Sequence, residues 1–441
     1  MEQRRKNLTQ LFIPICLETL LYMLSGMVDT LMLSSVNDQA VGAVGTANTY
    51  IGIFIIMFSV ISSGMVAVMT QNIGAGRPGV AYQARQLGLA FNAVLGVIMS
   101  LFLSLGAGTI LSGVGVADAL MQPAKTYLQI VGGFCILNAL IPICSSYLRA
   151  FGFSKEPLYA SIIGNVINFC LNAFFLFVLH KGVAGVATAT VISRIINLVI
   201  VVLLGAVLVK AKQHPERESN RAVMGQIIRI GLPSACETAI YNVSMTLVIR
   251  FLNQMDAQGL NVTARSYTMQ ITNFSYCVGA ALAQANAIMT GWHIGAKEYD
   301  ACDRGTKKAA VIGVIVAVIL ETMFALCSGW IMQLFSKDPQ MVSLVGKLLA
   351  IDIVLEMGRV TNLVYGQALK TSGDAVFPVV MGACFMILCS VGGTYLFGIR
   401  LGLLAVGAYI GMTGDECVRA VGMYLRWKSG KWKEKGLVKS R

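Results

Sequence analysis

Long apolar stretches separated by short polar breaks run along the whole chain. A stretch of about 20 apolar residues can cross a bilayer as a helix, because each residue rises ~1.5 Å and the hydrocarbon layer is ~30 Å thick. The pattern predicts twelve spanning helices, approximately over residues 10–35, 44–70, 86–112, 124–148, 157–179, 183–210, 225–254, 262–292, 309–335, 341–369, 375–398 and 401–426.

The second half of the chain repeats the first. Four residues around one polar break recur 221 positions later: Leu148, Arg149, Gly152 and Pro157 return as Leu369, Lys370, Gly373 and Pro378. Five residues near the start of each half recur 219 positions later: Pro14, Glu18, Thr19, Tyr22 and Ser25 return as Pro233, Glu237, Thr238, Tyr241 and Ser244. Each copy carries an even number of helices, so the two copies enter the membrane from the same side as parallel repeats.

These patterns predict an all-α integral membrane protein with twelve transmembrane helices in two pseudo-symmetric six-helix lobes. We expect an N-terminal lobe over residues 1–210 and a C-terminal lobe with a basic cytoplasmic tail over 225–441. Residues 211–224 form a polar break between them and are predicted to be a cytoplasmic linker.

Composition and charge fix the setting of these helices. Apolar residues make up 56% of the 441 and charged residues 12%, with a mean hydropathy of +0.71, which is outside the range of soluble domains. Of the 34 Lys and Arg residues, 25 fall on the side that carries the termini and four on the other. Basic loops stay cytoplasmic, so we expect a multi-pass plasma-membrane protein with both termini inside. The net charge of +13 therefore reports topology, and no nucleic-acid partner is expected.

Several chemistries lack their motifs. The chain has no Gly-x-x-x-x-Gly-Lys-Ser/Thr phosphate loop and no Cys-x-x-Cys pair among its eleven cysteines. Its three histidines are scattered over predicted loops on both sides of the membrane. We therefore expect no enzyme activity, no cofactor and no metal apart from a possible Na⁺.

The first lobe carries a carboxylate in the outer half of a predicted helix. Asp29 falls roughly 10 Å to the outer side of the middle of its helix, at ~1.5 Å per residue. Asn168, Asn172 and Thr190 fall in the outer half of their helices, so the four could meet. Their oxygen and amide groups suit a hard cation such as Na⁺, and a buried carboxylate can instead hold a proton. The alternative is that the amides only bridge helices.

The second lobe carries more ionisable residues. Asp352, Glu356 and Arg359 share one face of a predicted helix, and Arg359 is expected to neutralise Glu356. Asp352 then has no obvious partner on its own helix. Glu237, four residues after Pro233, either belongs with these three in a second polar site or serves the backbone gap that the proline opens.

Two further features have structural interpretations. Asp415 and Arg419 are spaced i, i+4 and are predicted to form an ion pair. Glu18, four residues after Pro14, is expected to serve the gap in backbone hydrogen bonding at that proline.

Several motifs, in order along the chain, resemble the multidrug and toxic compound extrusion (MATE) family. They cover nearly the whole sequence: Pro14 with Tyr22 and Val28-Asp29-Thr30, Gln71 to Gly76, Leu148 to Gly152 with Pro157, Asn168 with Asn172, Gly182 to Thr190, Gly231-Leu232-Pro233, and Arg426 to Trp432. The resemblance implies an antiporter that exports amphipathic, often cationic compounds in exchange for Na⁺ or H⁺. Its two lobes would open alternately to either side.

The resemblance also implies a cation site. An acid in the first helix and groups on the fifth and sixth helices form that site in bacterial members, which matches Asp29, Asn168, Asn172 and Thr190. The family often has Asp where this chain has Asn172, so one negative charge is missing.

A substrate cleft would hold aromatic and methionine side chains, which suit flat organic cations. Our candidates, on the repeated first and seventh helices, are Tyr22, Met27, Tyr241 and Met245. The expected partners are an amphipathic small molecule, the coupling cation and the bilayer, with the chain acting as a monomer. The alternative function is a flippase for lipid-linked precursors, which would gather several cations; the arginines inside helices are instead scattered, at Arg194, Arg250, Arg265 and Arg359.

Overall fold

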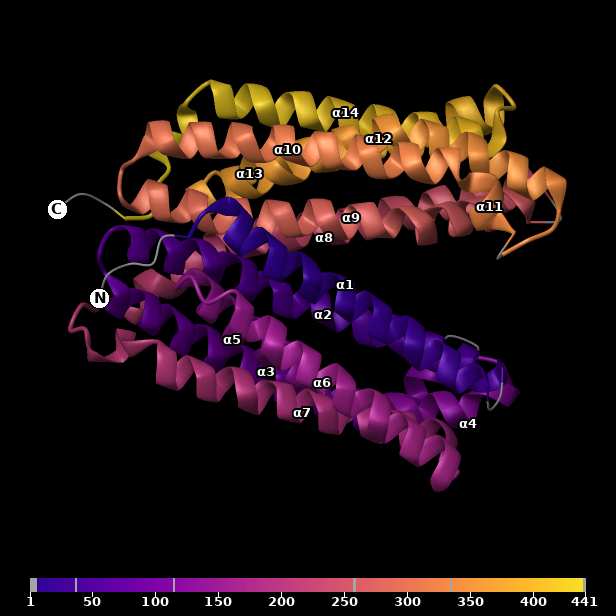
Figure 1. The fold of residues 1–441 in the computed structure, drawn as a ribbon, viewed down its shortest axis with the longest axis horizontal. Helices are drawn as coiled ribbons and strands as arrows, with labels where there is room; N and C mark the ends of the chain where they lie inside the picture. The colour runs from indigo at the N-terminus through magenta and orange to yellow at the C-terminus, as the bar shows by residue number, and fades with distance from the viewer. Residues whose placement is uncertain (1–5, 36–37, 114–115, 257–258, 334, 439–441) are drawn as a thin grey trace. The chain divides into compact units, whose positions relative to one another are not determined.

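The structure, a computed structural model, is helical throughout its regular parts (Figure 1). It describes residues 6–35, 38–113, 116–256, 259–333 and 335–438. Some of the basic residues counted near the termini lie outside the described residues: Arg4, Arg5, Lys439 and Arg441. The chain divides into two compact units, residues 1–231 and 232–441, which we call lobe one and lobe two.

Lobe one contains seven α-helices and two short π-helical segments among its described residues, ahead of the polar break. Their bounds are α1 Leu8–Ser34, α2 Asp38–Gly74, α3 Pro78–Gly113, α4 Asp118–Tyr127, η1 Leu128–Gly132, α5 Ile136–Ala150, α6 Lys155–Ala173, η2 Phe174–Val178 and α7 Gly182–Leu208. The α4–η1 segment and α5 form a single path bent by 43°. Lobe one thus provides the six predicted spans.

The polar break holds a short 3-10 turn, η3 Lys210–Gln213, before α8 begins. The remaining elements are α8 Asn220–Met255, α9 Leu260–Gly295, α10 Tyr299–Leu326, α11 Ser328–Met332, α12 Pro339–Ser372, α13 Val376–Phe385, η4 Met386–Val391, η5 Thr394–Arg400, α14 Leu404–Lys428 and η6 Lys431–Glu434. With α13, η4 and η5 taken as one path, six long helical segments follow the break. The twelve-helix prediction is confirmed.

Hydropathy separates these segments. Seven described helices are long and apolar enough to cross a membrane, and the bent α4–α5 pair makes eight. The four long helices outside this set are α8, α9, α12 and α14, and each carries charged residues within its length. These charged residues lower the mean hydropathy of the four helices.

The predicted linker is bound to the start of α3. Glu218 forms an ion pair with Arg77 at 2.6 Å, and its backbone N–H donates to Gln83 Oε1 at 3.0 Å. The Gln83 amide donates back to the Glu218 carbonyl at 2.7 Å. The break between the repeats is therefore fixed to lobe one rather than free in solution.

The strongest repeated motif ends a helix in the same way in both lobes. Gly152 and Gly373 adopt φ of +86° and +100°, a left-handed conformation that glycine reaches without the clash of a Cβ. In each copy the next residue's N–H returns to the last helical turn: Phe153 to Leu148 O at 2.9 Å, and Asp374 to Leu369 O at 3.0 Å. The repeated Leu and Gly thus encode a helix stop.

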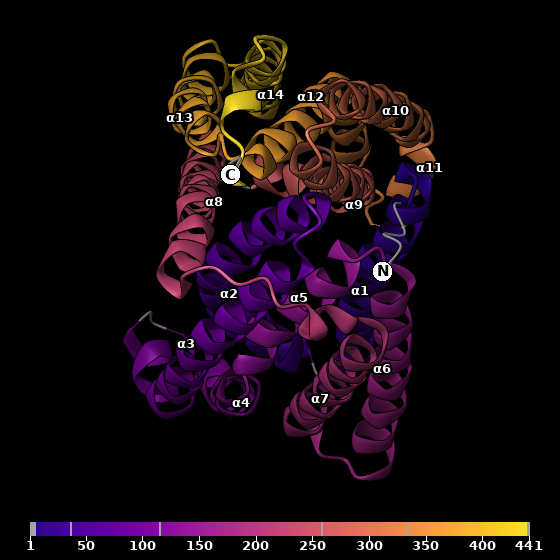
Figure 2. The same ribbon diagram turned by 90° about the vertical axis from the view of Figure 1, so that its left-hand side faces the viewer.

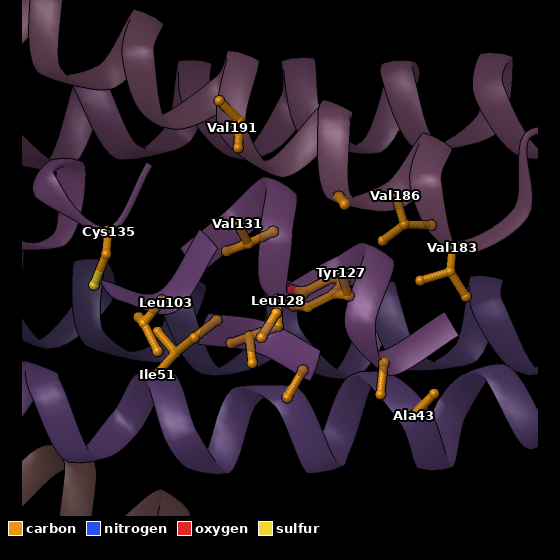
Figure 3. Packing of buried hydrophobic residues seen from close by; sticks show 14 of the residues in the cluster. Ala43, Ile51, Leu103, Tyr127, Leu128, Val131, Cys135, Val183, Val186 and Val191 are labelled. Carbon is orange, nitrogen blue, oxygen red and sulfur yellow. The ribbon is translucent and has the colours of Figure 1, made fainter. Parts of the chain in front are cut away.

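Side chains pack tightly inside lobe one. Figure 3 shows Tyr127, Leu128 and Val131 of the α4–η1 segment beside Leu103 of α3 and Val186 of α7, and all five belong to one buried hydrophobic cluster. The α4–η1 segment therefore forms the apolar centre of the lobe. Helix α6 contacts both α1 and α7, which brings the predicted site-bearing helices together (Figure 2).

In lobe two, α12 is the central helix, in contact with α9, α10 and α14. Helix α14 also approaches η4 and η5 closely, through glycines. A Cβ on Gly411 would lie 2.8 Å from Cys389 O and 2.9 Å from the Gly393 carbonyl carbon. Small residues let helices in membranes approach this closely, so Gly411 is a packing requirement.

Gly411→Ala should therefore destabilise the protein, by about 1–3 kcal/mol for an overpacked contact. The measurement is the melting temperature of the detergent-solubilised protein. Gly414→Ala on the same helix is the matched control, because a Cβ there meets nothing within 4 Å. Equal melting temperatures for the two variants would contradict the close-packed interface.

Candidate functional site

The lobe-one candidates meet through the amide of Asn172. Its Nδ2 donates to Asp29 Oδ1 at 2.7 Å and lies 3.3 Å from Asn168 Oδ1. Asn172 is fully buried and Asp29 is half-buried, on α6 and α1 respectively. Three of the four residues predicted to form the site are therefore in one hydrogen-bonded cluster.

The fourth residue, Thr190, uses its hydroxyl within its own helix. The hydroxyl donates to Val186 O at 2.9 Å, and no hydrogen bond described here joins Thr190 to Asp29 or the two asparagines. Asn172 Oδ1 is buried with no hydrogen-bond partner among the described residues. The cluster thus holds a carboxylate next to an unused amide oxygen, which are groups that a cation or a proton could use.

A guanidinium lies near this cluster. Arg194 of α7 donates to Asn138 Oδ1 of α5 at 2.9 Å, and it acts electrostatically on both Asp29 and Tyr127. The sequence showed Arg194 only as one of several scattered arginines. Its position inside a predicted span was the available signal, since a charge there needs a reason.

Lobe two contains a continuous network of charges between α12 and α14. Arg359 donates to Glu356 Oε2 at 2.8 Å, as the spacing predicted, and its Nε lies 3.5 Å from Glu416 Oε1. Glu416 in turn pairs with Arg419 at 2.9 Å. Arg359 thus has two acidic neighbours, of which the sequence identified one.

Arg419 also forms the predicted pair with Asp415, with two nitrogen–oxygen distances of 2.8 and 3.0 Å. Ser390 donates to Asp415 Oδ2 at 3.0 Å, and Asn362 donates to Glu416 Oε2 at 3.0 Å. Nearly every charge on this face of α14 is therefore paired and hydrogen-bonded, as a buried ion pair requires.

Two buried acids have oxygens outside these pairs. Asp352 is 2% exposed, and its Oδ2 has no hydrogen-bond partner in the part of the chain that the structure describes. Glu321 of α10 is fully buried, and neither of its carboxylate oxygens has a hydrogen-bond partner among the described residues, although the Ser275 hydroxyl is close enough to act on it. The sequence predicted that Asp352 has no partner on its own helix. It did not predict that Glu321 lies near enough to Asp352 to interact with it electrostatically.

Glu237 and Glu18 form matching ion pairs that the sequence interpretation missed. Glu18 Oε2 accepts from Arg149 at 2.6 Å, and Glu237 Oε2 lies 2.6 Å from Lys370 Nζ. Both partners belong to the repeated motif, so the duplication preserved a salt bridge in each lobe. The assignment of Glu18 to the proline gap was wrong, and Glu237 pairs with Lys370 instead of with Asp352 or Glu356.

A cavity of about 200 Å³ lies within lobe two. Residues lining it include Tyr241, Met245, Arg265, Asp352, Arg359 and Tyr409. Two of the predicted substrate residues, Tyr241 and Met245, thus line a common cavity. The other two, Tyr22 and Met27, are 67% and 49% exposed on α1 and are not among its lining residues.

Arg265 of α9 is a charged lining residue that sequence reasoning missed. It is 5% exposed, and its Nε has no hydrogen-bond partner among the described residues. In the sequence, Arg265 is only an isolated arginine within a predicted span. Whether its side chain faces α12 depends on the rotation of α9 about its axis.

Two lobes of six spanning helices, each with ionisable side chains within its spans, define a multi-pass membrane transporter. A family model for MatE matches residues 14–174 and again 233–396, once in each repeat. The chain belongs to this family, the MATE transporters.

Relatives support the same assignment along the full length. The chain is 33% identical over 431 residues to the uncharacterized transporter YisQ of Bacillus subtilis, covering 96% of this chain and 94% of YisQ. It is 23% identical over 450 residues to a probable multidrug resistance protein NorM of Thermotoga maritima, covering 98% and 94%. A solved outward-facing multidrug resistance MATE family transporter shares the fold, with a TM-score of 0.86 at 18% identity over 98% of this chain and 96% of that one.

The Glu356–Arg359 pair gives a direct prediction for stability. Arg359→Gln alone leaves Glu356 buried without a counter-charge and should destabilise lobe two by about 3–5 kcal/mol, whereas Glu356→Gln leaves Arg359 with Glu416 at 3.5 Å and should cost less. The double variant should recover much of the loss, because Glu416 keeps its pair with Arg419. The measurement is a double-mutant cycle on melting temperature in detergent.

Lys307→Gln is the control for this cycle. Lys307 pairs with Asp303 at 2.6 Å on the surface, with 49% of its side chain exposed. Solvent screens such a pair, so its loss should change the melting temperature little. Strictly additive losses for Glu356 and Arg359 would reject the buried pair.

Proposed function

We propose that this protein is a secondary active antiporter that exports amphipathic organic compounds in exchange for an inward-moving cation, by alternating access of its two lobes. Membership of the MATE family supports transport, and the multidrug resistance names of relatives such as NorM support a small organic substrate. Ionisable groups within the spans of each lobe supply sites at which a cation could be exchanged.

The observation that carries the coupling proposal is the hydrogen bond from Asn172 to Asp29. A carboxylate within a span is stable only with a partner, and here the direct partner is a neutral amide. Asp29 can therefore change its occupancy by a cation without breaking an ion pair. Asp29 is the coupling group in this proposal, with Asn168 and Asn172 holding it in place.

The charges around Asp29 favour H⁺ over Na⁺ as the coupling ion. Na⁺ needs several oxygen ligands and is held best where negative charge exceeds positive. This cluster contains one carboxylate, and the Arg194 guanidinium acts on it. A proton needs only the one carboxylate, so it suits the cluster better.

We also propose a location and an oligomeric state for the transporter. The bias of Lys and Arg supports a plasma-membrane protein with both termini cytoplasmic, and one chain carries both lobes, so a monomer suffices. The flippase alternative needs a cluster of free cations for pyrophosphate. Arg359 and Arg419 are instead paired with acids, and Arg194 is bonded to Asn138.

Asp29→Asn should leave folding intact and abolish gradient-driven export, because the amide cannot exchange a proton. The measurement is efflux of a fluorescent organic cation from proteoliposomes under separately imposed pH and Na⁺ gradients. We expect the pH gradient to drive efflux by the parent protein. Neither gradient should drive efflux by the variant.

Asp118→Asn is the matched control, since Asp118 is an exposed acid at the start of α4 and should leave transport unchanged. Full efflux by Asp29→Asn would refute the coupling role. Efflux by the parent under a Na⁺ gradient alone would refute the choice of proton.

Asn172→Asp should restore a second carboxylate to the cluster. Two neighbouring carboxylates repel each other and attract a cation, so the pH optimum of transport should move upward or a Na⁺ dependence should appear. The pH profile of efflux, recorded with and without Na⁺, measures both effects.

Asn165→Asp on the same helix is the comparison, because Asn165 bonds to the Leu21 carbonyl and not to Asp29. A pH profile and Na⁺ response of Asn172→Asp identical to those of the parent would exclude Asn172 from the coupling site.

A further inference from the structure

We propose that the cavity within lobe two binds a zwitterionic amphipathic ligand, whose anionic end is held by Arg265 and whose ammonium end is held by Asp352. Treating this ligand as an exported substrate rests on the proposed function; its binding does not. The proposal follows from two buried side chains of opposite charge that line one cavity without pairing with each other.

Arg265 is a buried cation without a carboxylate. Its closest described polar contact is Met245 Sδ, at 3.7 Å from Nη2, and a thioether is only a weak acceptor. No salt bridge to Arg265 occurs among the described residues, whereas Arg359 and Arg419 each have acidic partners. An unpaired charge at this depth is costly, so an anionic group in the cavity would stabilise it.

Asp352 presents the opposite charge to the same cavity. Its neighbour Arg359 is bonded to Glu356 and lies 3.5 Å from Glu416, which leaves Asp352 Oδ2 without a hydrogen bond in the described chain. Asp352 lines the cavity and has no ion pair among the described residues, so its carboxylate is a natural partner for an ammonium group.

The two charges are separated along the helices. Asn261 Oδ1 accepts a hydrogen bond from Ala405 N at 3.0 Å. The starts of α9 and α14 therefore lie at the same height along the helix axes. The Cys417 thiol lies 3.9 Å from Val354 O, which sets α14 level with α12. Counting from these contacts, the backbone of Arg265 is level with Gly346 of α12. Gly346 precedes Asp352 by six residues, or about 9 Å along the helix at ~1.5 Å per residue. A ligand that contacts both side chains therefore needs its two charges on separate groups.

The rest of the cavity lining suits an aromatic body. Three tyrosines and three methionines line the cavity: Tyr241, Tyr276, Tyr409, Met245, Met269 and Met412. Tyrosine offers a flat apolar face with a polar tip, and methionine adapts its shape to different ligands. The cavity is smaller than the ~300–1,000 Å³ usual for drug-sized ligands, so it fits a compact molecule or one end of a larger one.

A simple organic cation accounts for only half of this arrangement. Such a ligand would pair with Asp352 but would leave Arg265 unpaired and add a like charge to its cavity. A simple anion would leave Asp352 unpaired in the same way. Only a ligand with both groups satisfies both side chains.

The test uses three probes that share one body, a biphenyl with an aminomethyl group at one end and a carboxylate at the other. The second probe is its methyl ester, which is only cationic, and the third is its N-acetyl derivative, which is only anionic. Isothermal titration calorimetry on the purified full chain in detergent measures their affinities without any gradient. The zwitterion should bind at least about tenfold more tightly than either derivative, because each loses one charged contact.

Two variants test which side chain binds each charged end of the ligand. Arg265→Gln should weaken the zwitterion about tenfold without weakening the ester, and Asp352→Asn should weaken the zwitterion and ester alike without weakening the N-acetyl probe. Arg250→Gln is the control, because Arg250 is an exposed arginine of α8 that is not among the cavity's lining residues. Its binding profile should equal that of the parent.

The proposal is overturned if the parent binds the three probes equally or binds none, or if Arg265→Gln weakens the ester as much as the zwitterion. Proteoliposome efflux distinguishes this failure from failure of the antiport proposal. Loss of gradient-driven efflux with the binding pattern intact refutes antiport alone. Active efflux without discrimination among the probes refutes the zwitterion site alone.

Discussion

An ionised side chain inside a membrane helix needs an opposite charge or a full set of hydrogen bonds, and the second lobe is organised around that requirement. Arg359 and Arg419 of α12 and α14 join Glu356, Asp415 and Glu416 into one network. This network lies between the two helices that also make extensive contact along their lengths. Packing and charge pairing therefore reinforce each other, and the residues left outside the pairs stand out as the candidates for binding.

The first lobe meets the same requirement with fewer charges. Asp29 is held by an amide, and Arg194 is held by another amide, so neither forms a direct ion pair in the described chain. Neutral partners hold a charge less firmly than ions do, which suits the coupling role that we propose for Asp29. The lobes thus share a duplicated fold but use different chemistry: amide-held charges in one, paired and unpaired charges around a cavity in the other.

Pairs within a single helix were predictable from spacing alone. Glu356 with Arg359 and Asp415 with Arg419 were both expected, because residues three or four apart share a helix face. Pairs between helices were not. Glu18 and Glu237 were assigned to proline gaps or to a second site, and the structure gives them Arg149 and Lys370, which lie more than a hundred residues away. The repeat had already placed both partners in matching motifs, so the duplication contained a signal that spacing along one helix could not reveal.

The sequence by itself determined that the chain is a multi-pass membrane protein, its helix count and the duplication, because the lengths of apolar stretches and the repeated helix-ending glycines are properties of the chain order. It also selected Asp29, Asn168 and Asn172, since depth in the membrane follows from residue number at a fixed rise per residue. Only the tertiary structure decided which helix faces meet. The rotation of α7 directs the Thr190 hydroxyl to its own backbone, and the rotation of α9 brings Arg265 to the cavity that Asp352 lines. Helix rotation is set by side-chain packing against neighbouring helices, which no single stretch of sequence specifies.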